Sequence, residues 1–425
     1  MTHPARALLL GLLFCIGTIS PVWAAKPPTP PAASQSLDRQ VLILLRLPPE
    51  HFEANAAYGG GYGSGAGRAA RQRIARRIAK THGLTLVQAW PMPLLGLDCF
   101  VMSAPEGRTL EVVTAALSHD RDVAWSEPMH TYRAQAAAPG SQPSPPNDPL
   151  FRVQPVAAQW RLAELRSVAT GRGVKVAVID SSIDSQHPDL KGQVSVRQNF
   201  VSDHADVPEL HGTGVAGIIA AISDNHLGIA GIAPDARLMA LRACWQLNGA
   251  STLCDTLSLA KALHYALQNG AQVINLSLSG PPDQLLGQLI DVGLRQGVVV
   301  VGAVDPGLPG GGFPASHPGV VAVASGRTTS DGPNRIYVAP GLDVPTTLTG
   351  ARWGLVNGSS YAAAHVSGLY ALMLEREPRG RSLPMLIALS GGGAIDACAS
   401  IRRGAPPCEG CACKPPLRYS ADARR

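Results

Sequence analysis

Residues 174–180 read Val-Lys-Val-Ala-Val-Ile-Asp, an apolar and largely β-branched run that ends in a carboxylate. Runs of this kind are typical of a parallel strand that is covered on both faces. Three later runs have the same texture: residues 273–278, 298–301 and 320–324. Helical patterns at 212–221 and 257–267 lie between them, and this alternation of strand and helix predicts an α/β domain built on a parallel sheet.

A smaller folded unit is expected before this domain, at residues 38–134. Its expected strands cover residues 41–45, 84–90 and 97–102, and a last strand starts at 123–125. Its expected helices cover residues 71–82 and 110–117. The order β-α-β-β-α-β is that of a ferredoxin-like α+β fold. An Ala-, Pro-, Ser- and Gln-rich stretch at 135–147 follows, and it predicts an exposed linker and a domain boundary.

The N-terminus has the features of a secretory signal peptide at residues 1–25. Arg6 supplies a positive charge, residues 7–19 are apolar, and Ala24 and Ala25 are small residues that suit signal cleavage. The apolar run is too short to span a bilayer comfortably. Residues 26–37 are rich in Pro, Ala and Ser and predict a flexible leader. We therefore expect a secreted or periplasmic protein without membrane contact after signal removal.

The composition is that of an ordinary globular protein. Of the 425 residues, 45% are hydrophobic and 16% are charged, and the formal net charge is +6. Part of the basic excess lies between Arg68 and Lys80, but no recognition motif and no interleaved aromatic residues accompany it. We interpret this stretch as a solvated face, and we expect a monomer without a nucleic-acid partner.

Three polar residues, far apart in the chain, occupy positions that suit nucleophilic catalysis. Asp180 lies at the carboxyl end of the first strand, where catalytic groups collect in such sheets. His211 begins the segment His-Gly-Thr-Gly-Val-Ala-Gly, whose small residues let a helix pack closely behind the imidazole. Ser360 lies where a glycine-containing turn passes into an alanine-rich helix. Each residue alone also fits a structural role in a turn, a core hydrogen bond or a helix cap.

Together the three residues predict a hydrolytic triad. Histidine titrates near neutral pH and can take the proton of a serine hydroxyl, while a buried carboxylate fixes the histidine tautomer. Backbone N–H groups at a helix N-terminus favour the negative charge that develops on an attacked carbonyl, so the backbone of Ser360 is an expected oxyanion donor. The chain order Asp, His, Ser is one of the few known to give this geometry.

These segments resemble the subtilisin-like serine peptidases, the subtilase family. The resemblance rests on segments in the family's order: residues 180–190, 211–217, 228–234, 274–280, 339–341 and 357–366. It implies a three-layer catalytic domain at 148–382 and a secreted serine endopeptidase that cleaves proteins or peptides through an acyl-enzyme. It also implies that Asp180, His211 and Ser360 are catalytic. The residues implied to contact substrate are Ser277, Leu278, Ser279 and Gly280.

By the same resemblance, the unit at 38–134 is an inhibitory prodomain and a partner of the catalytic domain. Its last strand, near residues 123–132, would lead into a tail that fills the active site. Self-cleavage in the linker would then release the mature enzyme.

The match is weaker at several positions around the expected site. Four of these changes remove no proton-transfer group: Ser182, Gly214, Tyr361 and Ala364. A fifth matters more, because Asp305 stands nearest to the position at which the family supplies an asparagine to the oxyanion hole. A protonated aspartate can donate a hydrogen bond there, whereas an ionised one accepts hydrogen bonds and repels an oxyanion. We assign the oxyanion role to Asp305 and expect a working but slow or acid-tuned peptidase.

Six cysteines remain once the signal peptide and the prodomain are removed. They are Cys244, Cys254, Cys398, Cys408, Cys411 and Cys413. An even set in an exported protein favours disulfides, and we expect Cys244 and Cys254 to close a short loop. The four cysteines of the C-terminal tail, residues 383–425, can pair in three ways. Their spacing leaves metal binding open as an alternative.

Two other functions stay open at this stage. One is a catalytically weak or silent subtilase-like scaffold that binds peptides, for which Asp305 is the main argument. The other is an exported structural or adhesive protein that binds through its Cys-rich tail. Calcium is common in the family, but no acidic cluster here has a diagnostic metal spacing. We therefore expect no required cofactor.

Overall fold

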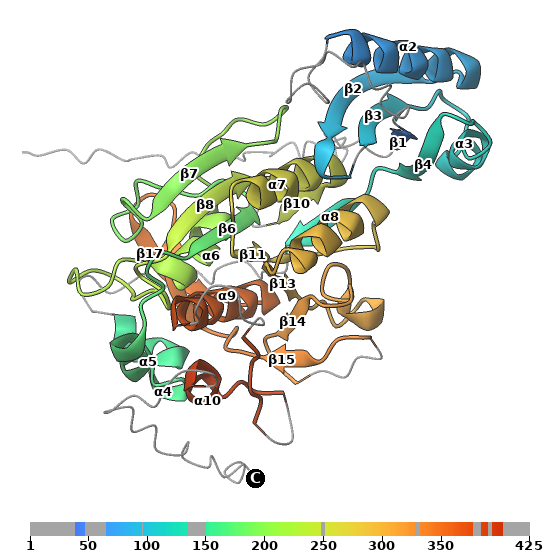
Figure 1. Ribbon diagram of the computed structural model, residues 1–425. Helices are drawn as coiled ribbons and strands as arrows, with labels where there is room; N and C mark the ends of the chain where they lie inside the picture. The colour runs from blue at the N-terminus through green and yellow to red at the C-terminus, as the bar shows by residue number, and fades with distance from the viewer. Residues whose placement is uncertain are drawn as a thin grey trace, which may run out of the picture.

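The computed structural model describes residues 39–46, 65–95, 97–134, 150–247, 251–327, 332–376, 384–389 and 393–402. The expected signal peptide, the flexible leader and the linker lie outside these residues. The described part of the chain forms an N-terminal α+β unit and a larger α/β unit (Figure 1).

The larger unit is built on a parallel sheet, as the sequence predicts. Within the described residues this sheet has seven strands in the order β15-β14-β13-β11-β6-β8-β7. The strands are β6 (Lys175–Asp180), β7 (Val194–Asn199), β8 (Arg237–Arg242), β11 (Val273–Leu276), β13 (Val299–Ala303), β14 (Val321–Ala324) and β15 (Ile336–Val338). Every neighbouring pair in this sheet is parallel.

Helices cover both faces of this sheet, which explains the continuous apolar run in β6. Val176 and Val178 pack in one cluster with α6 (Leu210–Ala220) and α9 (Ser359–Arg376). The alternate residues Ala177 and Ile179 pack in a second cluster with α7 (Thr256–Gln268) and α8 (Gln284–Arg295). Successive strand residues point to opposite faces, so both sets are buried. The predicted three-layer arrangement is confirmed.

Shorter elements complete the larger unit. They are η2 (Leu150–Val153), α4 (Pro155–Gln159), α5 (Leu162–Val168), β9 (Cys244–Gln246), β10 (Thr252–Asp255), β12 (Leu278–Ser279), η3 (Pro309–Gly311), β16 (Val344–Leu348), β17 (Arg352–Val356) and α10 (Ala397–Arg402). The expected disulfide joins Cys244 and Cys254, which lie opposite each other on β9 and β10.

The C-terminal segment is partly integrated into the core. Leu386, Ile395 and Ile401 are buried in the cluster that contains α9. Cys398 is disulfide-bonded. The other tail cysteines, Cys408, Cys411 and Cys413, lie outside the described residues.

The N-terminal unit has the predicted ferredoxin-like topology. Its elements are β1 (Gln40–Arg46), α2 (Gly65–His82), β2 (Thr85–Met92), η1 (Pro93–Leu95), β3 (Leu97–Ser103), α3 (Leu110–Leu117) and β4 (Val123–Pro128). The sheet order is β2-β3-β1-β4, with antiparallel neighbours. Helix α2 begins at Gly65, six residues before the expected start at Arg71.

Both faces of the N-terminal sheet are apolar, and the second face docks on the larger unit. Val41 and Ile43 pack against the unit's own helices. Leu42 and Leu44 belong instead to the cluster that contains residues of α7 and α8. Figure 1 shows these two helices lying between the blue N-terminal unit and the large sheet. The two units therefore share a continuous buried apolar layer.

The expected last strand of the N-terminal unit is wrong as a single element. Strand β4 ends at Pro128, and β5 (Thr131–Ala134) joins a different sheet with the order β12-β5-β10-β9. His130 lies at the break, where its N–H donates to Thr256 Oγ1 at 3.1 Å and its carbonyl accepts the Thr256 N–H at 3.1 Å. These two hydrogen bonds hold the chain at the start of α7, so the residues after His130 no longer pair with the first sheet.

Glu127 on β4 docks against the first turn of α8. Its Oε2 accepts the N–H of Gln284 at 3.1 Å and its Oε1 accepts that of Leu285 at 3.2 Å. The N-cap residue Asp283 accepts the Leu286 N–H at 2.9 Å in the same turn. Burial, and then the charge of Asp283, raise the pKa of Glu127 to about 7, although the two N–H bonds oppose this shift.

This geometry predicts docking that weakens as the pH rises. The pKa of Glu127 is raised above its ordinary value of 4.5, so the stabilisation present below pH 4.5 is lost as the pH approaches 7. In a full chain carrying Ser360→Ala, to prevent self-cleavage, we expect Glu127→Gln to remove about 1–3 kcal/mol of this pH dependence. Urea unfolding at pH 4.5, 6 and 8 measures it.

The matched control is Glu106→Gln, which alters an exposed carboxylate of the same unit. The control is expected to keep the pH dependence of the parent chain. Equal slopes for Glu127→Gln and the parent would contradict the assignment.

Candidate active site

Asp180 and His211 meet inside the larger unit. Asp180 ends β6, and His211 is the second residue of α6. His211 Nδ1 lies 2.7 Å from Asp180 Oδ1, and both side chains are 2% exposed. A carboxylate accepts hydrogen bonds, so Nδ1 carries the proton and Nε2 presents its lone pair. His211 Nε2 has no hydrogen-bond partner among the described residues. Its lone pair is therefore able to accept a proton.

The start of α6 packs directly on the loop that follows Asp180. Ser181 N–H donates to Asp180 Oδ1 at 2.7 Å, and Ser181 Oγ accepts the Gly212 N–H at 3.0 Å. A Cβ atom at Gly212 would lie only 2.3 Å from the Ser181 carbonyl oxygen. Only glycine therefore lets the helix approach closely enough to join the imidazole and the carboxylate.

Ser360 is the second residue of α9 and is fully buried. Its hydroxyl donates to the Ser277 carbonyl at 2.9 Å, while Ser277 Oγ donates to the Ser360 carbonyl at 2.8 Å. Asn275 Nδ2 donates to Ser277 Oγ at 2.8 Å. These bonds fix the helix start against the segment after β11, and they explain why the predicted strand 273–278 breaks at Ser277.

The structure places α9 beside α6, with the Tyr361 ring 5.6 Å from the His211 ring. In this state the Ser360 hydroxyl donates to Ser277 and not to His211 Nε2. Catalytic hydrogen bonds are often long or poorly aligned in a free enzyme and tighten only when substrate is bound. The structure thus brings Asp180 and His211 into contact and places Ser360 on the neighbouring helix.

The residues implied to contact substrate hold a strand of the same chain. Strand β5 lies between β12 and β10 and is antiparallel to both. Leu278 is paired with Ala134, and Ser279 with Arg133. An extended segment thus leads along the substrate-contact residues toward Ser277, which touches Ser360.

Tyr132 anchors β5 against Gly280 and Phe313. Its side chain is fully buried and lies 6.2 Å from the Phe313 ring. A Cβ atom at Gly280 would meet Tyr132 Cδ1 at 2.3 Å, so the absent side chain at this position makes room for the ring. Gly280, the fourth residue predicted to contact substrate, therefore provides space for a bulky side chain.

Asp305 lies in the loop after β13. Its Oδ1 accepts the Gly307 N–H at 2.9 Å, and its own N–H donates to the Gly311 carbonyl at 2.9 Å. The first of these bonds uses the carboxylate as an acceptor within its own loop. The predicted oxyanion role of Asp305 stays a prediction.

Other polar residues of the motifs have structural partners. Asp189 is buried and accepts hydrogen bonds from Asn225 Nδ2 at 2.9 Å and from Trp353 Nε1 at 2.7 Å. His365 Nδ1 lies 2.9 Å from the Tyr361 carbonyl, and burial lowers the pKa of His365 to about 4. His187 Nε2 lies 2.9 Å from the Arg352 carbonyl.

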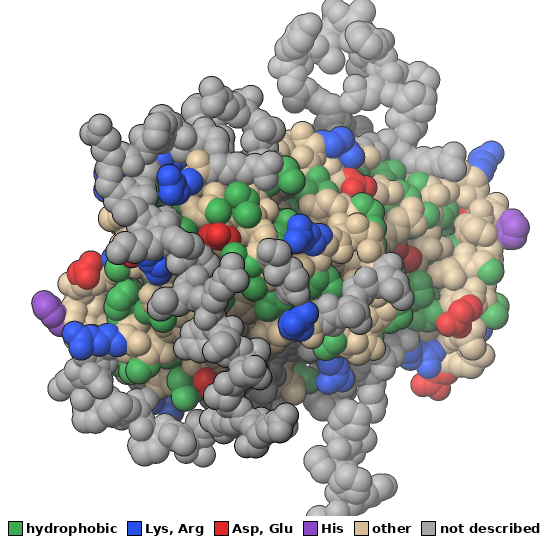
Figure 2. Space-filling view, turned by 90° about the horizontal axis from the view of Figure 1, so that it is seen from below, with side chains coloured by type: hydrophobic (Ala, Val, Ile, Leu, Met, Phe, Trp, Pro, Cys, Tyr) green, Lys and Arg blue, Asp and Glu red, His purple; other side chains and the backbone are tan. Residues whose placement is uncertain are grey.

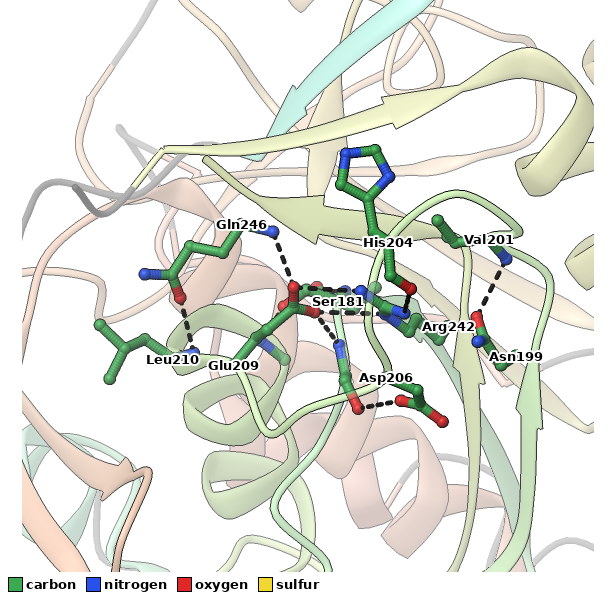
Figure 3. A network of polar contacts seen from close by, with 12 residues as sticks. Ser181, Asn199, Val201, His204, Asp206, Glu209, Leu210, Arg242 and Gln246 are labelled. Atoms are coloured by element: carbon green, nitrogen blue, oxygen red, sulfur yellow. Dashed lines mark hydrogen bonds and ion pairs between the residues drawn. The ribbon is translucent and has the colours of Figure 1, made fainter. Parts of the chain in front are cut away.

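The sequence reasoning missed a buried ion pair beside the triad. Glu209 and Arg242 meet at 3.3 Å, with side chains 8% and 3% exposed (Figure 3). One sequence feature points to it in hindsight. Arg242 ends an otherwise apolar strand, where an arginine requires a buried partner. The sequence does not show that this partner is Glu209.

The described residues show few other ligand-binding features. Among them no group of three or more His, Cys, Asp and Glu side chains has a geometry that could hold a metal ion. In the same part of the chain no helix is both long enough and apolar enough to span a bilayer. Figure 2 shows basic and acidic side chains interspersed over the visible face rather than gathered in one basic patch.

The chain is similar to known proteins. Residues 171–385 match the model of the subtilase family. The chain is 35% identical over 280 residues to the thermophilic serine proteinase of Bacillus sp. (strain AK1), covering 63% of this chain and 67% of that protein. It is 36% identical over 233 residues to subtilisin E of Bacillus subtilis (strain 168), covering 49% of this chain and 57% of that protein.

A solved structure shares the fold. The crystal structure of fervidolysin from Fervidobacterium pennivorans, described as a keratinolytic enzyme related to subtilisin, matches with a TM-score of 0.60 and 20% identity. The match covers 87% of this chain and 61% of that one.

The contact at Gly212 gives a direct test of the site geometry. Gly212→Ala places a methyl group against the Ser181 carbonyl, which must push the start of α6 away from Asp180. We expect kcat/KM for a peptide substrate to fall by about 10²-fold or more, since misplacement of about 1 Å has an effect of this size. Gly326→Ala is the control, because no atom lies within 4 Å of its Cβ position. Equal activity of the two variants would contradict this account.

Proposed function

The chain belongs to the subtilase family of serine peptidases, and on this premise we propose that it hydrolyses peptide bonds through an acyl-enzyme on Ser360. The observation that carries the proposal is the buried His211–Asp180 hydrogen bond of 2.7 Å beside a serine at a helix N-terminus. The neutral imidazole with a free Nε2 is the form of histidine that acts as a general base.

The proposed reaction has two halves. His211 Nε2 takes the proton of Ser360 Oγ as that oxygen attacks the scissile carbonyl, and Asp180 stabilises the imidazolium that forms. The imidazolium then protonates the leaving amine, and an ester on Ser360 remains. Water, deprotonated by the same imidazole, attacks the ester, and the imidazolium returns this proton to Ser360 Oγ as the acid is released. The backbone N–H of Ser360 would face the oxyanion, since the first N–H groups of a helix lack partners within it.

Strand β5 supports a mode of substrate binding. A peptide would add as an antiparallel strand between β10 and β12, with backbone hydrogen bonds for affinity and side-chain pockets for selectivity. The Tyr132 pocket, lined by Gly280 and Phe313, would take an apolar or aromatic side chain.

Occupation of this cleft by β5 also supports a latent precursor. We propose that residues 38–134 act as an inhibitory prodomain, that self-cleavage within 135–147 separates them, and that residues 1–25 direct export. The mature enzyme would act as a secreted or periplasmic monomer without a cofactor.

The second candidate function is a catalytically weak peptide-binding scaffold. The acceptor role of Asp305 in its own loop favours it, because an acceptor would not stabilise an oxyanion.

Self-cleavage tests the proposed function without a foreign substrate. We expect the secreted wild-type chain to have an intact mass that corresponds to cleavage within 135–147, whereas Ser360→Ala should end at full length minus any signal peptide. Thr349→Ser is the processing control, because this position lies outside the triad. Identical masses for the wild type and Ser360→Ala would sink the proposal.

Replacing Asp305 separates the two candidate functions. If the peptidase lacks a strong oxyanion donor, Asp305→Asn supplies an amide N–H, and kcat for a peptide anilide should rise on the order of 10²-fold, the effect of one such donor. Asp343→Asn on another exposed turn controls for the loss of a surface carboxylate. Unchanged or lower kcat in Asp305→Asn would remove Asp305 from the oxyanion site.

A further inference from the structure

The buried Glu209–Arg242 pair is the strongest feature that the proposed mechanism does not use. Glu209 immediately precedes α6, and Arg242 is the last residue of β8. Arg242 Nη2 lies 3.3 Å from Glu209 Oε1, and Arg242 Nε lies 3.4 Å from Oε2. Taking two charges out of water is costly, so a pair as buried as this one is weak evidence for a purely stabilising role.

The Glu209 carboxylate binds two further segments. Oε2 accepts the Ser182 N–H at 2.7 Å, and Oε1 accepts the Gln246 N–H at 2.9 Å. Glu209 occupies the N-cap position of α6, yet its side chain makes no capping bond to that helix. The carboxylate at this position is thus turned toward the neighbouring loop and strand (Figure 3).

These contacts hold the loop after Asp180 against the segment that leads to His211. Ser182 follows Asp180 by two residues, and His211 follows Glu209 by two residues. Ser182 and Glu209 exchange two hydrogen bonds, because the Glu209 N–H also donates to the Ser182 carbonyl at 2.9 Å. Any slip between this loop and the start of α6 would therefore break both bonds and change the spacing between Asp180 and His211.

Arg242 fixes the same residues from the sheet. It lies opposite Asp180 in the register of β6 and β8, and the Ala243 N–H donates to the Asp180 carbonyl at 2.9 Å. Arg242 Nη1 also donates to the His204 carbonyl at 3.1 Å, in the segment before α6. Its guanidinium thus joins the end of β8 to the chain that carries His211.

The charges around this pair are balanced. Glu209 compensates Arg242, while Arg197 on β7 pairs with Asp206 at 2.9 Å in a more exposed position. The His204 ring stacks on Trp245, and burial followed by the charge of Arg242 lowers the pKa of His204. The charges of Asp203, Glu209 and Asp255 oppose this shift. Asp180 lies two residues before Ser182, and His211 lies two residues after Glu209. Removing the Glu209 charge alone would leave a buried cation near the Asp180–His211 pair.

We propose that Glu209 and Arg242 are a positioning pair that holds the His211 imidazole against Asp180. This inference rests on the proposed peptidase function, since it assigns the pair a role in that reaction. The pair touches neither the reacting atoms nor a substrate, so it acts only through the triad.

The test compares three variants, each expressed as the full chain and assayed once self-cleavage within 135–147 is complete. Glu209→Gln keeps an oxygen that can accept N–H bonds but loses the charge that compensates Arg242. We expect kcat to fall about tenfold or more while KM stays within about twofold, because the spacing of catalytic groups changes and the cleft does not. The uncompensated cation disfavours an imidazolium, so the acid limb of the pH–rate profile should move to lower pH.

The double variant Glu209→Gln/Arg242→Gln removes both charges. It should return the acid limb to its wild-type position and recover at least about threefold in kcat over Glu209→Gln, since a buried neutral pair avoids the uncompensated charge. Asp224→Asn is the matched control, because it breaks an ion pair with Arg166 in which the aspartate is exposed. This control should stay within about twofold of the wild type.

A second readout does not need turnover. In full chains carrying Ser360→Ala, the NMR resonance of the His211 Nδ1 proton reports its hydrogen bond to Asp180. Glu209→Gln should shift or broaden it, and the double variant should restore it. An inactive wild type would overturn the peptidase function, and this resonance would then decide the positioning role alone. Wild-type kcat, an unmoved acid limb and an unmoved resonance in Glu209→Gln would overturn the inference.

Discussion

The hydrogen bond between His211 Nδ1 and Asp180 Oδ1 is the constraint on which the rest of the site depends. Both groups are buried, so neither tolerates the loss of the other. The parallel sheet brings Asp180 to the carboxyl end of β6, and Gly212 lets α6 approach that end closely. Helix α9 packs beside α6 and carries Ser360 in its first turn. The fold thus determines the geometry of the Asp180–His211 contact.

The packing of the N-terminal unit explains why the segment that follows it lies between β10 and β12. Because β1 is apolar on both faces, its sheet buries one face on its own helices and the other on α7 and α8. That docking places the end of β4 at the start of α7, where Thr256 holds His130. The chain that follows His130 therefore continues as β5, between β10 and β12. One buried apolar surface thus positions a strand that would compete with substrate.

Much of this arrangement could be predicted from the sequence, and the failures share a cause. The periodicity of β6 and the glycine-rich start of α6 predict elements because each pattern is local. The departure of β5 from its sheet could not be predicted, because its partners β10 and β12 lie more than a hundred residues away. The Glu209–Arg242 pair could not be predicted either, because the position of one charged residue in the sequence does not indicate which residue it pairs with in the fold. Asp305 was identified by its position alone, and its bond to Gly307 became visible only in the fold.

The central claim is that Ser360 is the nucleophile served by His211. The most direct measurement is a crystal structure of the wild-type enzyme after reaction with a serine-directed phosphonate. The account predicts a covalent bond from Ser360 Oγ to phosphorus, the hydroxyl withdrawn from the Ser277 carbonyl, and His211 Nε2 within hydrogen-bond reach of Oγ or of a phosphonyl oxygen. An unmodified Ser360 that still donates to Ser277, with the label absent or on another residue, would contradict it.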